Sequence, residues 1–360
     1  MRKETPVHAL ERLKWFTVSR LVDGLLHLEM WLPLRANGIW TRRSAFTEGD
    51  IRKAANTTNP RAFFDAFAGG GATVPITEEV VGVSAGSVGH HRLWFQSPFV
   101  SGVGANNTVR ASLYRRARPA PLVLILVGTF AERFNSFGLS MAKTIAEKGS
   151  DCCWMAVPFS DGRSPAPGTS SFMTADPVAT AESFIQAVMD VERLSHILRA
   201  RFGYREIGLV GVSISGNICH AATFLQPYAG AVLIMAGASP ADIVWHARGA
   251  YWRRLRRLMG RTHAFREVES LWTMSDATRY TAPNLCPRFL MLNGLYDNLV
   301  TPAHARRLNA VIQNCRVIWY PGSHYSSPLF IGPAVENTVR FFRGEPLKDT
   351  GLKPKALTAP

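Results

Sequence analysis

Apolar and polar residues are arranged along this chain in two patterns, one typical of buried strands and one typical of helices. Short, almost continuously apolar runs recur from the middle of the chain onward, as expected for strands covered on both faces. Longer segments between them carry apolar residues at helical spacing. The predicted strands are 122–127, 206–210, 232–235, 288–292 and 316–320, and the predicted helices are 175–202, 217–225 and 303–312. This alternation predicts an α/β fold.

The part of the chain before residue 115 has a different pattern. Residues 7–34 predict an amphipathic helix whose leucines fall near one face. These leucines are Leu10, Leu13, Leu21, Leu25, Leu28 and Leu32. Two interpretations of this face stay open: it packs on the core, or it lies on lipid or lines a groove for an acyl chain. Beyond the Gly69–Gly71 break, residues 80–83, 93–95 and 109–113 predict early antiparallel strands.

The composition is that of a globular protein with a sizeable core. The chain has 360 residues, of which 47% are hydrophobic and 19% are charged, which suits one large α/β domain with insertions. The five cysteines are odd in number, and Cys152 and Cys153 are adjacent, which argues against a disulfide framework. The sequence has no His/Cys spacing typical of a metal site and no Gly-rich phosphate loop, so no cofactor is expected.

The net charge of +15 raises nucleic acids and anionic membranes as partners. No zinc-finger, RNA-binding or basic-zipper motif accompanies this charge, so we expect no nucleic-acid partner. The apolar stretch 21–34 is interrupted by Asp23 and Glu29 and lacks the anatomy of a signal peptide. No stretch approaches the ~20 apolar residues of a membrane span. The expected location is cytoplasmic, with peripheral contact to an anionic membrane left open.

The run Gly211-Val212-Ser213-Ile214-Ser215-Gly216 follows a predicted strand and precedes a predicted helix. A nucleophile elbow has this geometry: a strand leads into a sharp turn with a serine at its tip, and a helix follows. Such a turn exposes the hydroxyl to a histidine base and to backbone N–H groups that receive negative charge. Ser215 stands where a glycine is usual, and Gly216 is a second small residue at this helix–strand contact. Ser213 is therefore the candidate nucleophile.

Two candidate partners follow in the order acid, then base. Asp297 lies in a loop just beyond the strand 288–292, and His324 follows the strand 316–320 directly. Each of the three candidates thus sits at the C-terminal end of a strand. Asp242 remains an alternative acid, because it follows another predicted strand. His90 and His91 lie in an early strand region and are interpreted as structural or surface residues. His220 falls in the predicted helix after Ser213 and is interpreted as a packed residue.

With these residues the chain resembles the α/β-hydrolase superfamily. The pieces that carry the resemblance are LVGVSISGN, LMLNGLYDNLVTP and VIWYPGSHYSS, with PLVLILVGTFAERF and CWMAVPFSDGRSP before them. They span roughly residues 107–343. The resemblance implies a mostly parallel central sheet of about eight strands flanked by helices. It divides the chain into an N-terminal helical extension (1–75), a hydrolase domain (76–345) and a flexible tail (346–360).

The resemblance also implies a mechanism and a cap. Ser213 would attack an acyl carbonyl, His324 would take its proton, and Asp297 would orient the imidazole. The oxyanion would be bound by the N–H of Ile214 and by that of Thr129, with Phe130 as the alternative to Thr129. Val127 replaces the histidine that usually precedes the glycine of the second loop.

A cap insertion is expected at about 240–283, where the alternation of strands and helices stops. Its basic, aromatic stretch 251–259 predicts a helix with an apolar stripe over the active site. The arginines either face water or attract an anionic lipid or a carboxylated substrate.

The expected function is hydrolysis of a small-molecule acyl ester, including lipid esters and thioesters, through an acyl-enzyme. The alternatives are an acyltransferase with the same triad and a non-catalytic or peripheral membrane-binding protein with a hydrolase fold. The sequence names neither the acyl chain nor the oligomeric state.

Overall fold

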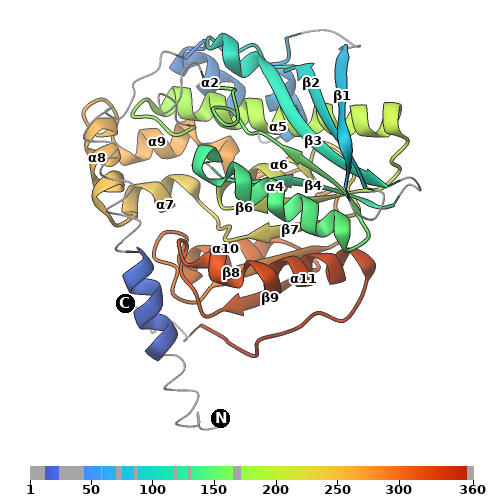
Figure 1. Ribbon diagram of the computed structural model, residues 1–360. Helices are drawn as coiled ribbons and strands as arrows, with labels where there is room; N and C mark the ends of the chain where they lie inside the picture. The colour runs from blue at the N-terminus through green and yellow to red at the C-terminus, as the bar shows by residue number, and fades with distance from the viewer. Residues whose placement is uncertain are drawn as a thin grey trace.

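The structure is a computed structural model of the whole chain (Figure 1). It describes residues 13–23, 44–57, 59–69, 75–84, 88–116, 120–128, 131–164 and 172–354. The predictions for Leu10, Leu25, Leu28 and Leu32 therefore lie outside the described residues.

Nine strands of the described chain form one sheet in the order β1-β2-β3-β5-β4-β6-β7-β8-β9. The strands are β1 (Ile76–Ser84), β2 (Val88–Gln96), β3 (Thr108–Arg116), β4 (Leu122–Leu126), β5 (Asp151–Met155), β6 (Ile207–Val212), β7 (Gly230–Ile234), β8 (Phe289–Gly294) and β9 (Cys315–Tyr320). The pairs β1–β2, β2–β3 and β3–β5 are antiparallel, and the other pairs are parallel. The expectation of a mostly parallel sheet of about eight strands is confirmed.

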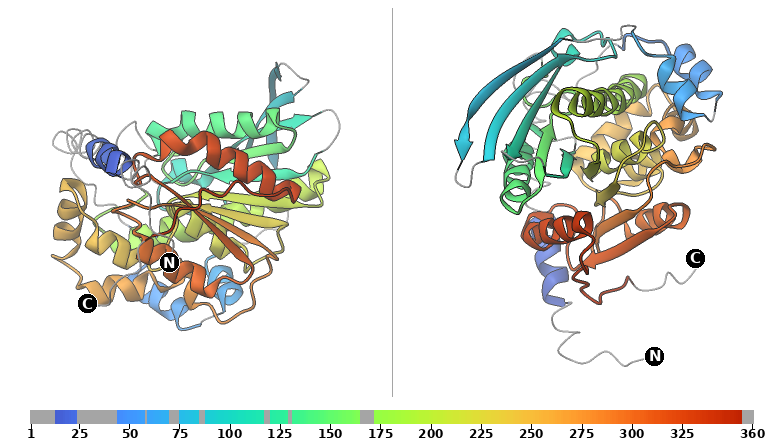
Figure 2. Two further views of the ribbon diagram at one scale, coloured as in Figure 1. Left: turned by 90° about the horizontal axis from the view of Figure 1, so that it is seen from below. Right: turned by 90° about the vertical axis from the view of Figure 1, so that its right-hand side faces the viewer.

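Helices cover both faces of this sheet (Figure 2). The larger ones are α4 (Ala131–Glu147), α5 (Pro177–Phe202), α6 (Ile214–Ala222), α10 (Pro302–Val311) and α11 (Ile331–Arg343). Side chains alternate along each central strand, so β4 directs Leu124 into one core and Ile125 into the other. The first core is closed by α5, α6 and α10, and the second by α4 and α11. Burial on both faces explains why these strands read as continuous apolar runs.

Local sequence signals place the ends of these helices. Asp176 caps α5, where its Oδ1 accepts hydrogen bonds from the N–H groups of Val178 and Ala179. Gly203 ends the same helix at a φ of 75°, which glycine adopts without strain. The helix predicted at 217–225 begins earlier, at Ile214, because the turn at Ser213 leads directly into it.

Three helices occupy the region between β7 and β8. They are α7 (Pro240–His246), α8 (Ala250–Met259) and α9 (Phe265–Leu271), followed by two short 3₁₀ turns, η2 (Thr273–Ser275) and η3 (Ala277–Arg279). Trp252 and Leu255 of α8 are buried, while Arg253 and Arg257 are exposed. The stretch 251–259 is thus the amphipathic helix that its spacing predicts.

Two short helices and a separate helical segment come from the N-terminal part. The short helices are α2 (Glu48–Ala55) and α3 (Pro60–Asp65). Residues 13–23 are also helical and lie beside the C-terminal third of the chain (Figures 1 and 2). Leu13 and Leu21 are each 61% exposed, whereas Ser19 and Asp23 are buried. For these described residues, the interpretation that the leucine face packs on the core is wrong.

Candidate active site

The turn after β6 holds Ser213 in a strained backbone conformation. Its φ of 61° and ψ of −129° lie in a region that residues other than glycine rarely adopt. Gly211 permits this turn, since a Cβ there would lie 2.2 Å from the carbonyl oxygen of Ser215. A Cβ on Gly216 would lie 2.6 Å from the Cβ of Ala236. The small residues therefore let α6 start close to the sheet, with Ser213 at the tip of the turn.

His324 lies between Ser213 and Asp297. Its Nε2 is 3.0 Å from Ser213 Oγ, and its Nδ1 is 2.9 Å from Asp297 Oδ2. The other carboxylate oxygen, Oδ1, accepts hydrogen bonds from the backbone N–H groups of Leu299 and Val300, both at 2.9 Å. A carboxylate can only accept, so Nδ1 of His324 carries the proton. Nε2 is then free to accept the proton of the serine hydroxyl.

Asp242, the alternative acid, lies away from His324. Its Oδ2 accepts hydrogen bonds from His304 Nε2 at 3.0 Å and from the Arg307 guanidinium at 2.7 Å. Burial disfavours its charge, but the hydrogen bonds from Arg307 and His304 outweigh burial and lower the pKa of Asp242. The structure therefore brings Asp297, and not Asp242, to the histidine.

The backbone around Ser213 offers a donor for an oxyanion. Ile214 is the first residue of α6, where an N–H group has no acceptor within the helix. The positive end of the helix dipole also points here. Gly128 passes close by, since a Cβ on it would lie 3.0 Å from the Cβ of Ser213. Thr129 and Phe130, the candidates for the second donor, lie outside the described residues.

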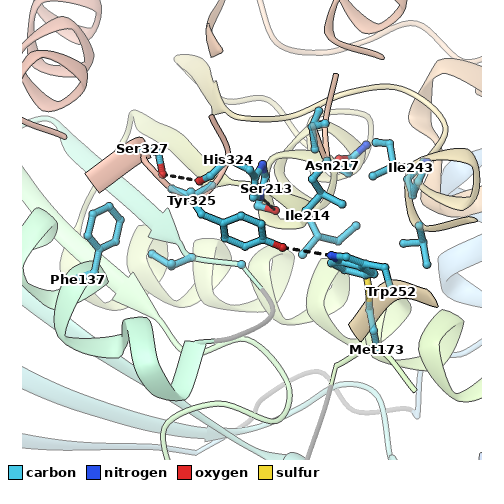
Figure 3. Close-up of a pocket in the computed structure, with 17 residues that line it drawn as sticks. Phe137, Met173, Ser213, Ile214, Asn217, Ile243, Trp252, His324, Tyr325 and Ser327 are labelled. Atoms are coloured by element: carbon cyan, nitrogen blue, oxygen red, sulfur yellow. Dashed lines mark hydrogen bonds between the residues drawn. The ribbon is translucent and has the colours of Figure 1, made fainter. Parts of the chain in front are cut away.

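Ser213 opens into a pocket with mainly apolar walls (Figure 3). The apolar residues that line it are Val127, Phe137, Met173, Val212, Ile214, Pro240, Ile243, Val244, Trp252, Leu299 and Val300. Its polar side chains include Asn217 and Ser327 besides Ser213 and His324. The pocket encloses about 950 Å³ including its open mouth. An apolar group of a ligand can therefore lie directly beside the serine hydroxyl.

No family model matches the sequence, and no curated protein matches it. Solved structures do match. An acetyl xylan esterase 1 from Thermoanaerobacterium sp. JW/SL YS485 superposes with a TM-score of 0.61 at 17% identity, over 81% of this chain and 93% of that one. An acetyl xylan esterase from Paenibacillus sp. R4 superposes with a TM-score of 0.60 at 15% identity, over 85% of this chain and 98% of that one.

The chain has the α/β-hydrolase fold. A cold-adapted esterase from an Arctic intertidal metagenomic library also matches it, with a TM-score of 0.50 at 17% identity, over 77% of this chain and 100% of that one. At these identities the likeness establishes the fold alone.

In this hydrolase fold, the region between β7 and β8 reaches the loop that carries His324. Trp252 Nε1 of α8 donates a hydrogen bond to the hydroxyl of Tyr325 at 3.2 Å, and both side chains are buried (Figure 3). Trp252 also lines the pocket. The residue after the candidate base is therefore tied directly to α8.

The other histidines of the sequence analysis lie away from this site. His90 stacks on Tyr114 with ring centroids 4.6 Å apart, and His91 Nδ1 is 2.9 Å from a Glu78 carboxylate oxygen. His220 is buried within α6, where loss of solvation lowers its pKa to about 4. It packs as an uncharged side chain.

Sequence reasoning missed four polar residues next to His324. Ser19 and Asp23 of the helix 13–23 meet Ser323 and Ser326 of the histidine loop. The available signal was the presence of two polar residues one turn apart in a leucine-rich helix. It was overlooked because the leucines were expected to determine the packed face.

Within the residues that the structure describes, no cluster of three or more His, Cys, Asp or Glu side chains is arranged to hold a metal ion. In the same residues, no helix combines the length and apolar character needed to cross a bilayer. All five cysteines are free, and four of them are buried.

Proposed function

We propose that this protein is a serine hydrolase of carboxylic esters and that the acyl group lies in the apolar pocket. The observation that carries the proposal is the unbroken chain of contacts from Ser213 Oγ through His324 to Asp297, with Ser213 and His324 in the lining of that pocket. An arrangement of this kind activates a hydroxyl: the serine lies in a strained turn, an imidazole lies within hydrogen-bond distance, and a buried carboxylate holds the imidazole.

In the proposed reaction, Ser213 Oγ forms a bond to the carbonyl carbon while its proton passes to His324 Nε2. The negative charge on the carbonyl oxygen is met by the N–H of Ile214 and by a second N–H from the loop after Gly128. Asp297 keeps the imidazole in the required tautomer and stabilises it once it is charged. The bond to the alcohol oxygen then breaks, and the alcohol leaves with the proton from His324.

Water completes the cycle. His324 takes a proton from the water molecule as its oxygen attacks the acyl-enzyme, and returns that proton to Ser213 Oγ when the acid leaves. The elbow geometry supports this sequence, because Ser213 Oγ lies 3.0 Å from His324 Nε2 and Ser213 immediately precedes the N-terminus of α6.

Two observations support an ester with an apolar acyl group. The pocket walls are mainly apolar and include Met173, Ile243 and Trp252. The names of the similar solved structures, acetyl xylan esterases and an esterase, agree with an ester as the substrate class. Lipid esters and thioesters fit the same chemistry.

The test is labelling with a fluorophosphonate probe, followed by intact-mass measurement of the wild type and of Ser213→Ala. We expect one probe per chain in the wild type and none in Ser213→Ala. Ser215→Ala is the matched control, since it changes a buried serine two residues away and should still be labelled. Hydrolysis of p-nitrophenyl esters from acetate to octanoate should follow the same pattern. A folded wild type that takes up no probe and cleaves no ester would contradict the proposal.

A further inference from the structure

Four buried polar side chains connect the N-terminal helical segment to the loop that carries His324. Ser19, Asp23, Ser323 and Ser326 are each at most 2% exposed. Ser323 Oγ donates to Asp23 Oδ1 at 2.5 Å, and Ser19 Oγ lies 3.2 Å from Ser326 Oγ. The loop residues come from the two positions that flank His324 and Tyr325. The helix is thus attached on both sides of the candidate base.

The same hydroxyls close the loop on itself. Ser323 N–H donates to Ser326 Oγ at 2.8 Å, and Ser326 N–H donates to Ser323 Oγ at 3.2 Å. A hydroxyl has one proton, so the proton of Ser323 that goes to Asp23 leaves its lone pairs for Ser326. Asp23 therefore determines the direction in which the Ser323 hydroxyl donates its proton.

Ring contacts extend the attachment to the loop of the acid. Phe16 packs edge-on against Tyr296, the residue before Asp297, with ring centroids 5.4 Å apart. Trp15 packs against Phe330, which follows the histidine loop, at 5.1 Å. The segment 13–23 consequently touches both loops that must be in register for His324 to reach Asp297 and Ser213.

Asp23 is a costly residue at this position. Its second oxygen, Oδ2, is buried and has no hydrogen-bond partner among the described residues. Burial raises the pKa of this carboxyl, the hydrogen bond from Ser323 opposes the rise, and the nearby charge of Asp297 adds to it. A buried polar group that is only partly satisfied destabilises a fold relative to an apolar side chain of similar size. Packing alone therefore does not account for a carboxyl here.

We propose that Asp23 is a positioning residue for the candidate base. By accepting the hydrogen bond from Ser323, it holds the 321–327 loop so that His324 spans Ser213 and Asp297. The inference rests on the proposed function, because it assigns Asp23 a role in the reaction of that site. Asp23 acts through Ser323 and contacts neither the substrate nor the reacting atoms.

Three variants distinguish the effect of the hydrogen bond between Ser323 and Asp23 from the effect of the negative charge of Asp23. Asp23→Ala removes the acceptor, Ser323→Ala removes the donor, and Asp23→Asn keeps an acceptor oxygen of the same shape without the charge. Leu21→Ala, on the exposed face of the same helix, is the matched control. For each variant, the rate of fluorophosphonate labelling, kcat and KM on p-nitrophenyl butyrate, and the thermal unfolding midpoint are measured.

We expect Asp23→Ala and Ser323→Ala to lower both the labelling rate and kcat by about 10- to 100-fold, because small displacements of a reacting group have effects of this size. KM should stay within about threefold, since neither residue lines the pocket. Asp23→Asn should stay within about threefold of the wild type in kcat, and Leu21→Ala should be unchanged.

The proposal is overturned if Asp23→Ala retains wild-type labelling and kcat in its folded fraction, whatever its unfolding midpoint. It is also overturned if Asp23→Asn loses as much activity as Asp23→Ala, since charge rather than hydrogen bonding would then matter.

A second readout does not need activity. The Nδ1 proton of His324, held by Asp297, should give a low-field proton resonance in the wild type that is lost or broadened in Asp23→Ala and retained in Asp23→Asn. If the wild type takes up no probe and cleaves no ester, the proposed function fails, and this resonance alone decides the positioning role. An unchanged resonance in Asp23→Ala would overturn that role.

Discussion

His324 Nδ1 lies 2.9 Å from Asp297 Oδ2, while Asp297 Oδ1 is held by two backbone N–H groups of its own loop. The carboxylate thus cannot rotate without breaking hydrogen bonds, and it presents one oxygen to the imidazole. This fixes both the direction of the ring and its tautomer.

Asp297→Asn should therefore lower kcat by about 10³- to 10⁴-fold while the protein stays folded. The amide oxygen would keep the backbone hydrogen bonds, so the amide nitrogen would face the imidazole and force the proton onto Nε2. That nitrogen could no longer accept the proton of Ser213. Steady-state kinetics on p-nitrophenyl butyrate would measure the loss.

Asp242→Asn is the control for this experiment, because Asp242 pairs with His304 and Arg307 instead. It should change kcat by no more than a few-fold. A larger loss in Asp242→Asn than in Asp297→Asn would reverse the assignment of the acid.

Truncation of the pocket wall should change acyl-chain preference. Ile243→Ala removes three carbon atoms from the wall beside Ser213. The ratio of kcat/KM for octanoate over acetate esters should rise by about 10-fold or more, since each methylene in an apolar pocket is worth ~1–3 kcal/mol. Leu258→Ala, on α8 and outside the pocket lining, should leave the ratio unchanged. An equal change in both variants would mean that the acyl group lies elsewhere.

The hydrogen bond between Trp252 and Tyr325 should be measurable as a coupling energy. Each single variant, Trp252→Phe or Tyr325→Phe, removes one of the two buried groups that form this hydrogen bond, and the other group loses it. The double variant removes both groups, so it should be less destabilised than the sum of the single variants by about 1 kcal/mol. Urea unfolding of the four proteins gives this value. As the control, a cycle that pairs Trp252→Phe with Val311→Ala, a change at an exposed residue of α10, should give a coupling energy near zero.

Burial of His220 makes stability depend on pH. Its pKa falls to about 4 in the folded protein through desolvation, against about 6.5 in an unfolded chain. The unfolded chain therefore binds more protons between these values, and stability is lost as the pH falls through that range. From pH 7 to pH 5 this residue alone should remove about 2 kcal/mol from the free energy of unfolding.

His220→Leu cannot take up a proton, so its free energy of unfolding should fall by about 2 kcal/mol less than that of the wild type over the same pH range. Urea titrations at the two pH values provide the comparison. Parallel losses in the two proteins would show that His220 is not the titrating group.

The buried pair of Arg163 and Asp190 predicts a large effect on stability. Both side chains are fully buried and 2.7 Å apart. Arg163→Met leaves the buried carboxyl of Asp190 without its cationic partner and should lower the free energy of unfolding by about 3–5 kcal/mol. Arg92→Met is the control, because Arg92 and Glu79 are more than half exposed and 3.6 Å apart. That change should be worth no more than about 1 kcal/mol.

Much of the fold could be predicted from local patterns. The strands β6 to β9 and the helices α5 and α10 coincide with apolar runs and helical spacing within a few residues. These signals are reliable because both faces of the central strands are buried, so each strand reads as an unbroken apolar run. The antiparallel strands β1 to β3 also fall where 80–83, 93–95 and 109–113 predict them, but they extend beyond those ranges, since strands near the sheet edge have a more exposed face and a weaker pattern.

The helix at 13–23 shows where such patterns fail. Its leucines suggested the packed face, yet Leu13 and Leu21 are exposed and the opposite side docks through Ser19 and Asp23. A single helix does not specify its partner, and here the partner is a polar loop some 300 residues away in the sequence. Periodicity predicts that a helix is amphipathic but not which surface it meets.

The sequence by itself determined the α/β class, the sharp serine turn and the order of Ser213, Asp297 and His324. The class and the turn depend on residues close together in the chain, and the order is read directly from the sequence. Only the tertiary structure decided between Asp297 and Asp242 as the partner of His324, and only it joined Asp23 to Ser323. These are contacts between loops at the ends of different strands. Their distances follow from the order and twist of the whole sheet, and no local pattern contains that information.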